Sequence, residues 1–113
     1  MDPKSLSILE FPKVLDALVS LTSFSAGSEL AERLRPLTHP PLVARRQSET
    51  TQARALLDEK PDVSLGGARD IRPHVGRAEK GISLTATELL DVQSTVACAR
   101  SLRRTLILSL IHI

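Results

Sequence analysis

The chain has 113 residues, of which 42% are apolar and 25% are charged, with 7 prolines and 5 glycines. This length suits one small domain, and the composition indicates a globular rather than a disordered chain. The 15 lysines and arginines and 13 acidic residues leave a net charge of +2, which is too small to establish a nucleic-acid partner. Only Phe11 and Phe24 are aromatic, so a core must be aliphatic, and this predicts an all-α fold.

Three features of the sequence indicate a reducing, cytoplasmic location. Cys98 is the only cysteine and cannot form an internal disulfide. The N-terminus lacks the basic and apolar regions of a signal peptide. The longest strongly apolar stretch, 106–113, is far shorter than the roughly 20 residues that span a bilayer.

Three helices are predicted in the first 35 residues. Asp2 and Pro3 are typical of an N-cap and a first helical residue, and they open a short segment over 4–9. The second helix begins near Pro12. Ser23 or Ser25 is expected to cap the third, which ends at Arg35 because Pro36 follows. The expected buried residues are Phe11, Val14, Leu15, Leu18 and Leu21 in the second helix and Leu30 and Leu34 in the third.

A linker over 38–41, with Pro41 in a first turn, precedes a helix predicted over 42–59, which contains no glycine or proline. Its apolar positions are weak, so we expect one modest packing face. The opposite side carries arginines, glutamate and glutamine. We interpret it as a solvated face or, alternatively, as a nucleic-acid or ribosomal contact.

The second half begins with a loop over 60–69 that contains Gly66-Gly67. Asp70 is expected to cap a short helix over 71–78, which Gly81 ends in a left-handed conformation. Thr85 and Glu88 form a capping box that opens a long last helix, with Leu84 packing on Leu89. The packing face predicted for this helix consists of Leu89, Val92, Val96, Ala99, Leu102 and Leu106.

No signal ends the last helix, and 106–113 is almost entirely aliphatic. Either this end tucks against the other helices, or the chain is a piece of something longer, which we prefer because a small monomer rarely exposes such a patch.

The sequence predicts no catalytic, cofactor-binding or metal-binding residue. The histidines His39, His74 and His112 are too far apart for a local metal site. The pair Gly66-Gly67 lacks the lysine and hydroxyl residue of a phosphate loop, and no serine has the surroundings of a nucleophile elbow. Cys98 is expected to be a small buried hydrophobe because no positive residue faces it.

Two basic groupings remain without an assigned role. The first contains Arg69, Arg72, Arg77 and Lys80, and the second contains Arg100, Arg103 and Arg104. Either could contact phosphates, and ordinary salt pairing is the alternative.

Several ordered motifs resemble one family. They are L-x-x-L-E-F-x-K-V-L (6–15), S-x-G-x-E-L-A-x-x-L-x-P-L (25–37), R-R-x-x-E-T-x-x-A-R-A-L-L (45–57), G-G-x-R-D-I-R-P (66–73), and R-A-E-K-G with L-T-x-x-E-L-L-D (77–91). With this spacing the chain resembles, over roughly residues 6 to 105, the N-terminus of the bacterial MutS-related proteins of the second subfamily (MutS-two). Pro12 and His39-Pro40-Pro41 depart from the family pattern. The end of the chain fits the family poorly, and 108–113 resemble a translated sequencing adapter.

The resemblance implies that residues 1–105 are an N-terminal segment of a MutS-like helical core and that 106–113 are a truncated helix end or a foreign tail. It implies a larger, homodimeric ATPase and endonuclease that binds ATP and magnesium outside this segment. Such a parent acts on DNA and on stalled ribosomes, through rRNA binding and subunit splitting, and suppresses recombination. The segment itself is expected to be non-catalytic and to have no membrane partner.

Two other hypotheses remain open. The chain could be a free-standing helical protein-interaction module whose apolar C-terminus binds a partner helix. It could also be a small nucleic-acid binder that acts through its arginine groupings.

Overall fold

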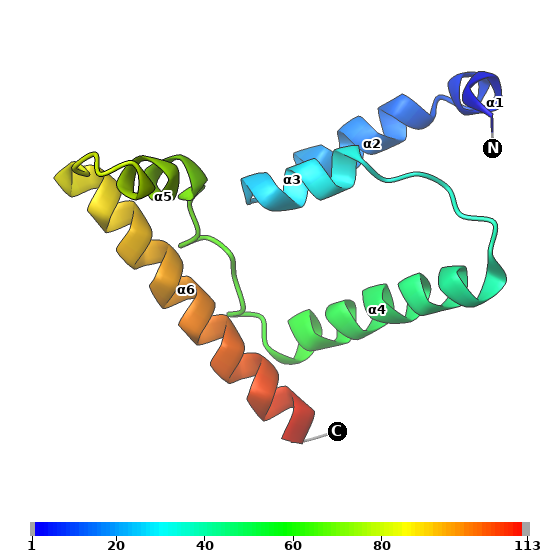
Figure 1. Cartoon of the computed structure of the whole chain (residues 1–113). Helices are drawn as coiled ribbons and strands as arrows, with labels where there is room; N and C mark the ends of the chain where they lie inside the picture. Colours follow the sequence, from blue (N-terminus) through cyan, green and yellow to red (C-terminus); the bar gives the residue numbers. More distant parts are fainter. Residues whose placement is uncertain (1, 112–113) are drawn as a thin grey trace. The chain divides into compact units, whose positions relative to one another are not determined.

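The computed structural model describes the backbone of residues 2–111 and side chains as far as residue 108. The described part holds six helices and no strand, which confirms the predicted all-α fold (Figure 1). Two compact units share the chain, Met1–Ala55 and Leu56–Ile113. The predicted division into 1–105 and 106–113 stays a prediction.

The first two helices begin as the sequence predicts. Asp2 is the N-cap of α1 (Pro3–Ile8), and its Oδ1 accepts a hydrogen bond of 2.7 Å from the backbone N–H of Ser5. This hydrogen bond lowers the pKa of the Asp2 carboxyl below its ordinary value. Helix α2 (Phe11–Ser20) has Pro12 in its first turn and follows Glu10, whose φ of 56° is left-handed.

Helix α2 contacts both α1 and α3 (Ser25–Glu32), and α2 and α3 form a helical hairpin (Figure 1). The side of α2 that becomes half-buried carries Phe11, Leu15 and Val19. Val14, Leu18 and Leu21 are exposed, so the predicted stripe is only partly right.

The prediction for the buried side of α3 is wrong. Leu30 and Leu34 are 70% and 47% exposed, whereas the small Ala31 is buried. The helices are short, and Ala31 is the one buried residue of α2 and α3. Leu30 and Leu34 therefore lie on the exposed side of the hairpin.

The predicted ends of α3 are also wrong. Phe24 occupies the N-cap position, and Ser25 is the first helical residue, with a buried hydroxyl that has no hydrogen-bond partner among the described residues. The helix ends at Glu32, earlier than Arg35. The Arg35 guanidinium instead donates to the carbonyl oxygens of Glu32 (3.2 Å) and Leu34 (2.6 Å), acceptors that the helix end leaves open.

Helix α4 (Pro40–Glu59) begins two residues before the predicted start, because both prolines fit its first turn. Its side chains are exposed except for Leu42, Val43 and Leu56, which are half-buried. The expected modest packing face is therefore limited to these positions. Arg45 and Glu49 form an ion pair of 3.2 Å along the helix surface.

The loop and the short helix exist as the sequence predicts, but α5 (Arg72–Glu79) begins one residue later than the predicted 71 and has Ile71 rather than Asp70 at the N-cap. Asp70 lies one position before the N-cap, Ile71, and its Oδ1 accepts from the backbone N–H of Arg72 at 3.2 Å. The C-terminus of α5 follows the Schellman pattern, with Gly81 N–H donating to Ala78 (2.9 Å) and Ile82 N–H to Arg77 (3.0 Å). Gly81 has the predicted left-handed φ of 75°.

Two glycines of unit two should respond to alanine in opposite directions. Gly81→Ala should destabilise the chain by about 1–2 kcal/mol, because a Cβ is strained at this positive φ. Gly76 lies inside α5, and a Cβ built there meets nothing within 4 Å, so Gly76→Ala should stabilise by about 0.5–1 kcal/mol. Urea denaturation of both variants checks this, and equal shifts of the midpoint would contradict the assigned helix end.

The last helix, α6 (Ala86–Ile111), has 26 residues and starts at the predicted capping box. The N–H of Glu88 donates to Thr85 Oγ1 (3.2 Å), and the N–H of Thr85 donates to Glu88 Oε2 (3.3 Å). The helix continues through Ile111, while His112 and Ile113 of the predicted tail lie outside the described residues.

Candidate functional site

The contacts of α6 within its unit run along a polar seam, which we define as Glu88, Asp91, Ser94, Thr95 and Cys98. Each of these side chains is half-buried. The predicted apolar face behaves differently, since Leu89, Val96 and Leu106 are 55%, 50% and 48% exposed and Ala99 is also exposed. The predicted packing face is therefore wrong for the described chain, apart from the half-buried Val92 and Leu102.

Hydroxyl groups of the polar seam hold the loop over 60–71, here termed the glycine loop, against α6. Ser94 Oγ donates to the carbonyl oxygen of Gly67 at 2.6 Å. Thr95 Oγ1 accepts from the backbone N–H of Arg69 at 2.9 Å and donates to the carbonyl oxygen of Asp91 at 2.8 Å. Farther along α6, Cys98 Sγ lies 3.5 Å from the carbonyl oxygen of Ser64. These bonds satisfy the backbone of a loop that has no secondary structure of its own.

Gly67 allows the loop to approach α6 closely. A Cβ built at this residue would lie 3.4 Å from Cys98 Cβ and 3.5 Å from Ser94 Oγ. A methyl group at this position would therefore touch both side chains. The Gly66-Gly67 pair therefore acts as a packing element, in agreement with its interpretation as a turn.

Helix α5 contacts the N-terminal part of the polar seam through a hydrogen bond and an ion pair. His74 Nε2 lies 3.2 Å from Asp91 Oδ2, and the guanidinium of Arg77 forms an ion pair with Glu88. Glu88 thus serves both the capping box and the contact between α5 and α6. Its side chain is 17% exposed, so the pair is better shielded from solvent than an ordinary surface pair.

In the first basic grouping, the side chains of Arg69, Arg72 and Arg77 make contacts within the chain. Arg72 pairs with Asp70 at 2.7 Å, and Arg77 pairs with Glu88. Arg69 donates from Nη1 to the carbonyl oxygens of Gly66 (2.8 Å) and Ala68 (3.1 Å). Salt pairing is therefore the correct interpretation for Arg72 and Arg77, and Arg69 braces its own loop.

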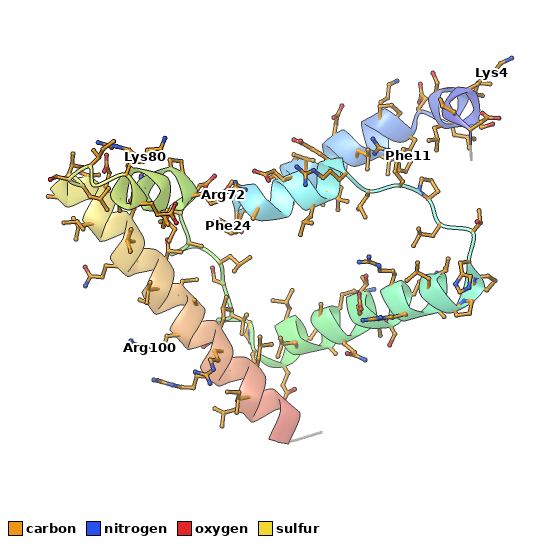
Figure 2. The ribbon with its side chains drawn as sticks, viewed as in Figure 1. Lys4, Phe11, Phe24, Arg72, Lys80 and Arg100 are labelled. Atoms are coloured by element: carbon orange, nitrogen blue, oxygen red, sulfur yellow. The ribbon has the colours of Figure 1, made fainter. Side chains whose placement is uncertain are left out.

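The second basic grouping has a different environment. Arg100, Arg103 and Arg104 line a shallow surface depression together with Ile107 and Leu108. All three arginines are exposed, and no carboxylate of the described residues pairs with them. Figure 2 shows Arg100 projecting away from α6. Salt pairing within the described chain is therefore the wrong interpretation for this grouping.

The residues considered for chemistry do not come together. His74 lies in α5 beside Asp91, His39 immediately precedes α4, and His112 lies outside the described residues. Cys98 is half-buried rather than buried. Within residues 2–111 no three histidine, cysteine or acidic side chains gather as a metal site would require. Over the same residues, no helix combines the length and hydropathy of a membrane span.

Sequence reasoning missed the polar seam. Its signal was the spacing of Glu88, Asp91, Thr95 and Cys98, which places polar side chains at i, i+3, i+7 and i+10 on one helix face. Apolar positions alone indicate the opposite side of α6, which the described chain leaves mostly exposed.

Comparisons with known proteins identify relatives of the whole segment. The chain is 42% identical over 104 residues to an endonuclease MutS2 of Symbiobacterium thermophilum, which covers 92% of the chain. It is 42% identical over 103 residues (91% of the chain) to that of Acetivibrio thermocellus and 40% identical over 104 residues to that of a Geobacillus species. The chain spans 13% of the length of these relatives. No family model and no solved structure matches it.

Proposed function

Because the chain belongs to the MutS2 family, we propose that it is a non-catalytic, helical scaffold segment near the N-terminus of an ATP-dependent DNA-binding endonuclease. ATP and magnesium bind outside the segment in this proposal. The whole protein is a cytoplasmic homodimer that suppresses recombination and also acts on stalled ribosomes through rRNA binding and subunit splitting. The relatives are named as endonucleases, which supports the endonuclease activity, and the family resemblance supports the remaining properties.

The observation that carries the scaffold role is the amount of apolar surface left uncovered. Of the described residues only Ala31 and Ala68 are buried apolar side chains. In α6 the exposed set includes Leu89, Leu90 and Val96, and in unit one it includes Leu21 and Leu30. Burial of such side chains stabilises a protein by about 1.5–3 kcal/mol each. These faces therefore suit a segment that packs against the remainder of a larger helical protein.

The purified 113-residue chain should neither hydrolyse ATP nor cleave DNA. The reason is chemical, since the sequence has no phosphate-loop motif and the described residues form no group for a catalytic metal. Phosphate release and plasmid nicking assays check this result, with an intact MutS2 relative as the positive control. ATP hydrolysis by the chain at a rate above that of buffer alone would contradict the proposal.

The exposed apolar face of α6 also favours the second candidate, a free-standing module that binds a partner helix. Sequencing the gene beyond codon 113 separates the two functions. An open frame that encodes a phosphate-loop motif supports the scaffold, whereas a genuine stop codon supports the module.

A further inference from the structure

We infer that the surface formed by Arg100, Arg103 and Arg104, here termed the arginine face, binds the phosphate backbone of a nucleic-acid duplex. The inference deepens the proposed function and rests on it, because an endonuclease must hold a nucleic acid. It adds a binding site in a segment for which we propose no catalytic role.

The arginine face has the spacing of a linear anion-binding surface. Its residues are at i, i+3 and i+4, so they share one side of α6. At 1.5 Å per residue, Arg100 and Arg104 are separated by roughly 6 Å along the axis of α6. Two successive phosphate steps on one strand of a duplex rise by about the same distance along the duplex axis. Guanidinium groups also suit phosphates because their planar donors bind two oxygens at once.

No carboxylate of the described residues pairs with the arginine face. Residues 92–111 contain these three arginines and no aspartate or glutamate. Arg45 and Arg77 behave differently, since Arg45 pairs with Glu49 and Arg77 pairs with Glu88. A cluster of exposed cations without a carboxylate partner in the described chain is available to an external polyanion.

The surroundings favour a duplex over a single strand. Proteins that bind single strands stack bases on aromatic side chains, and α6 has none. Both aromatic residues of the chain, Phe11 and Phe24, lie in the other unit. The arginine face can therefore contact the backbone but offers no stacking platform, so we expect binding that is independent of sequence.

The arrangement of apolar residues argues against an anionic membrane as the ligand. A helix that lies on a membrane places its cations and its apolar residues on opposite faces. Here Ile107 and Leu108 line the same depression as the three arginines. The depression also lacks the tryptophan or tyrosine that commonly anchors such a helix at the interface.

The test measures binding of the 113-residue chain to fluorescent 20-base-pair DNA and RNA duplexes by anisotropy across a salt series. Three phosphate contacts predict a log–log slope of about −2.7, which is roughly a 40-fold loss of affinity between 50 and 200 mM salt. The Arg100→Gln, Arg103→Gln, Arg104→Gln triple variant should lose this salt dependence. The triple lysine variant, which keeps the charges, should retain most of it.

A matched control replaces Arg45, Arg46 and Arg54 of α4 by glutamine, which lowers the net charge by the same amount. Unchanged duplex binding by this control supports the arginine face, and the two duplexes show whether DNA or RNA is the preferred source of phosphates. An equal loss in both glutamine variants overturns the inference, as does absence of wild-type binding at 50 mM salt. Tighter binding to phosphatidylserine vesicles or polyglutamate than to either duplex also overturns it. The scaffold role is tested separately, by activity and by packing, so the two can fail independently.

Discussion

Replacing Thr95 by valine should release the glycine loop from α6 and raise the exchange rate of the Arg69 amide by roughly 5- to 150-fold. The Thr95 hydroxyl accepts from this amide at 2.9 Å. Valine has nearly the same shape, so the change removes the acceptor and leaves the packing intact. Loss of one partner of a hydrogen bond costs about 1–3 kcal/mol, which sets the size of the effect. Amide hydrogen exchange followed by NMR measures it residue by residue.

The matched control for this variant is Thr51→Val in α4. The Thr51 hydroxyl donates only to the carbonyl oxygen of Gln47 in its own helix, at 3.0 Å. Its loss should leave exchange at Arg69 unchanged. If Thr95→Val likewise leaves the Arg69 amide protected, the polar seam does not hold the loop.

Replacing Glu88 by alanine should destabilise the second unit by about 2 kcal/mol. One part is the hydrogen bond that the Glu88 carboxylate accepts from the N–H of Thr85, which contributes about 1 kcal/mol. The other is the half-shielded ion pair with Arg77, which contributes about another 1 kcal/mol. Urea denaturation followed by circular dichroism at 222 nm gives the change in unfolding free energy.

Two control variants separate these contributions. Thr85→Ala removes only the other half of the capping box, the hydroxyl that accepts from the N–H of Glu88, and should cost about 1 kcal/mol. Glu79→Ala alters an exposed glutamate of α5 without a described partner and should change stability by less than about 0.5 kcal/mol. A Glu88→Ala variant no less stable than Thr85→Ala would show that the contact between α5 and α6 does not depend on this ion pair.

Helix boundaries were the most predictable part of the fold, because the signals that set them are local. Asp2 with Pro3, the box of Thr85 and Glu88, and the left-handed Gly81 each act within a few residues. Both ends of α3 are exceptions, because the helix stops at Glu32 and begins after Phe24. The Ser25 hydroxyl is buried and does not cap the helix, which the sequence alone does not reveal.

The buried faces were much less predictable, for two physical reasons. The apolar pattern of Leu30 and Leu34, or of Leu89 and Val96, does not say what covers it, and the described chain leaves these side chains exposed. The polar seam depends on hydrogen bonds such as the one from Ser94 to Gly67, which joins residues 27 positions apart. Nothing local indicates that such a hydroxyl and carbonyl meet.

Among the candidate site residues, the separation of the two arginine groupings could be predicted only in part. The absence of acidic residues after Asp91 is readable from the sequence and already distinguishes Arg100, Arg103 and Arg104. The pairing of Arg77 with Glu88 across 11 positions requires the turn at Gly81 to bring α5 back to α6.

The central claim is that the exposed apolar face of α6 packs against the remainder of a MutS2-family protein. Maleimide labelling of Leu89→Cys, in a Cys98→Ser background, tests it most directly in the 113-residue chain and in the full-length protein that carries this segment. Rates are referenced to those in urea. We expect rapid labelling in the short chain, where Leu89 is 55% exposed, and labelling at least about tenfold slower in the full-length protein. Equal rates in the two proteins would contradict the account.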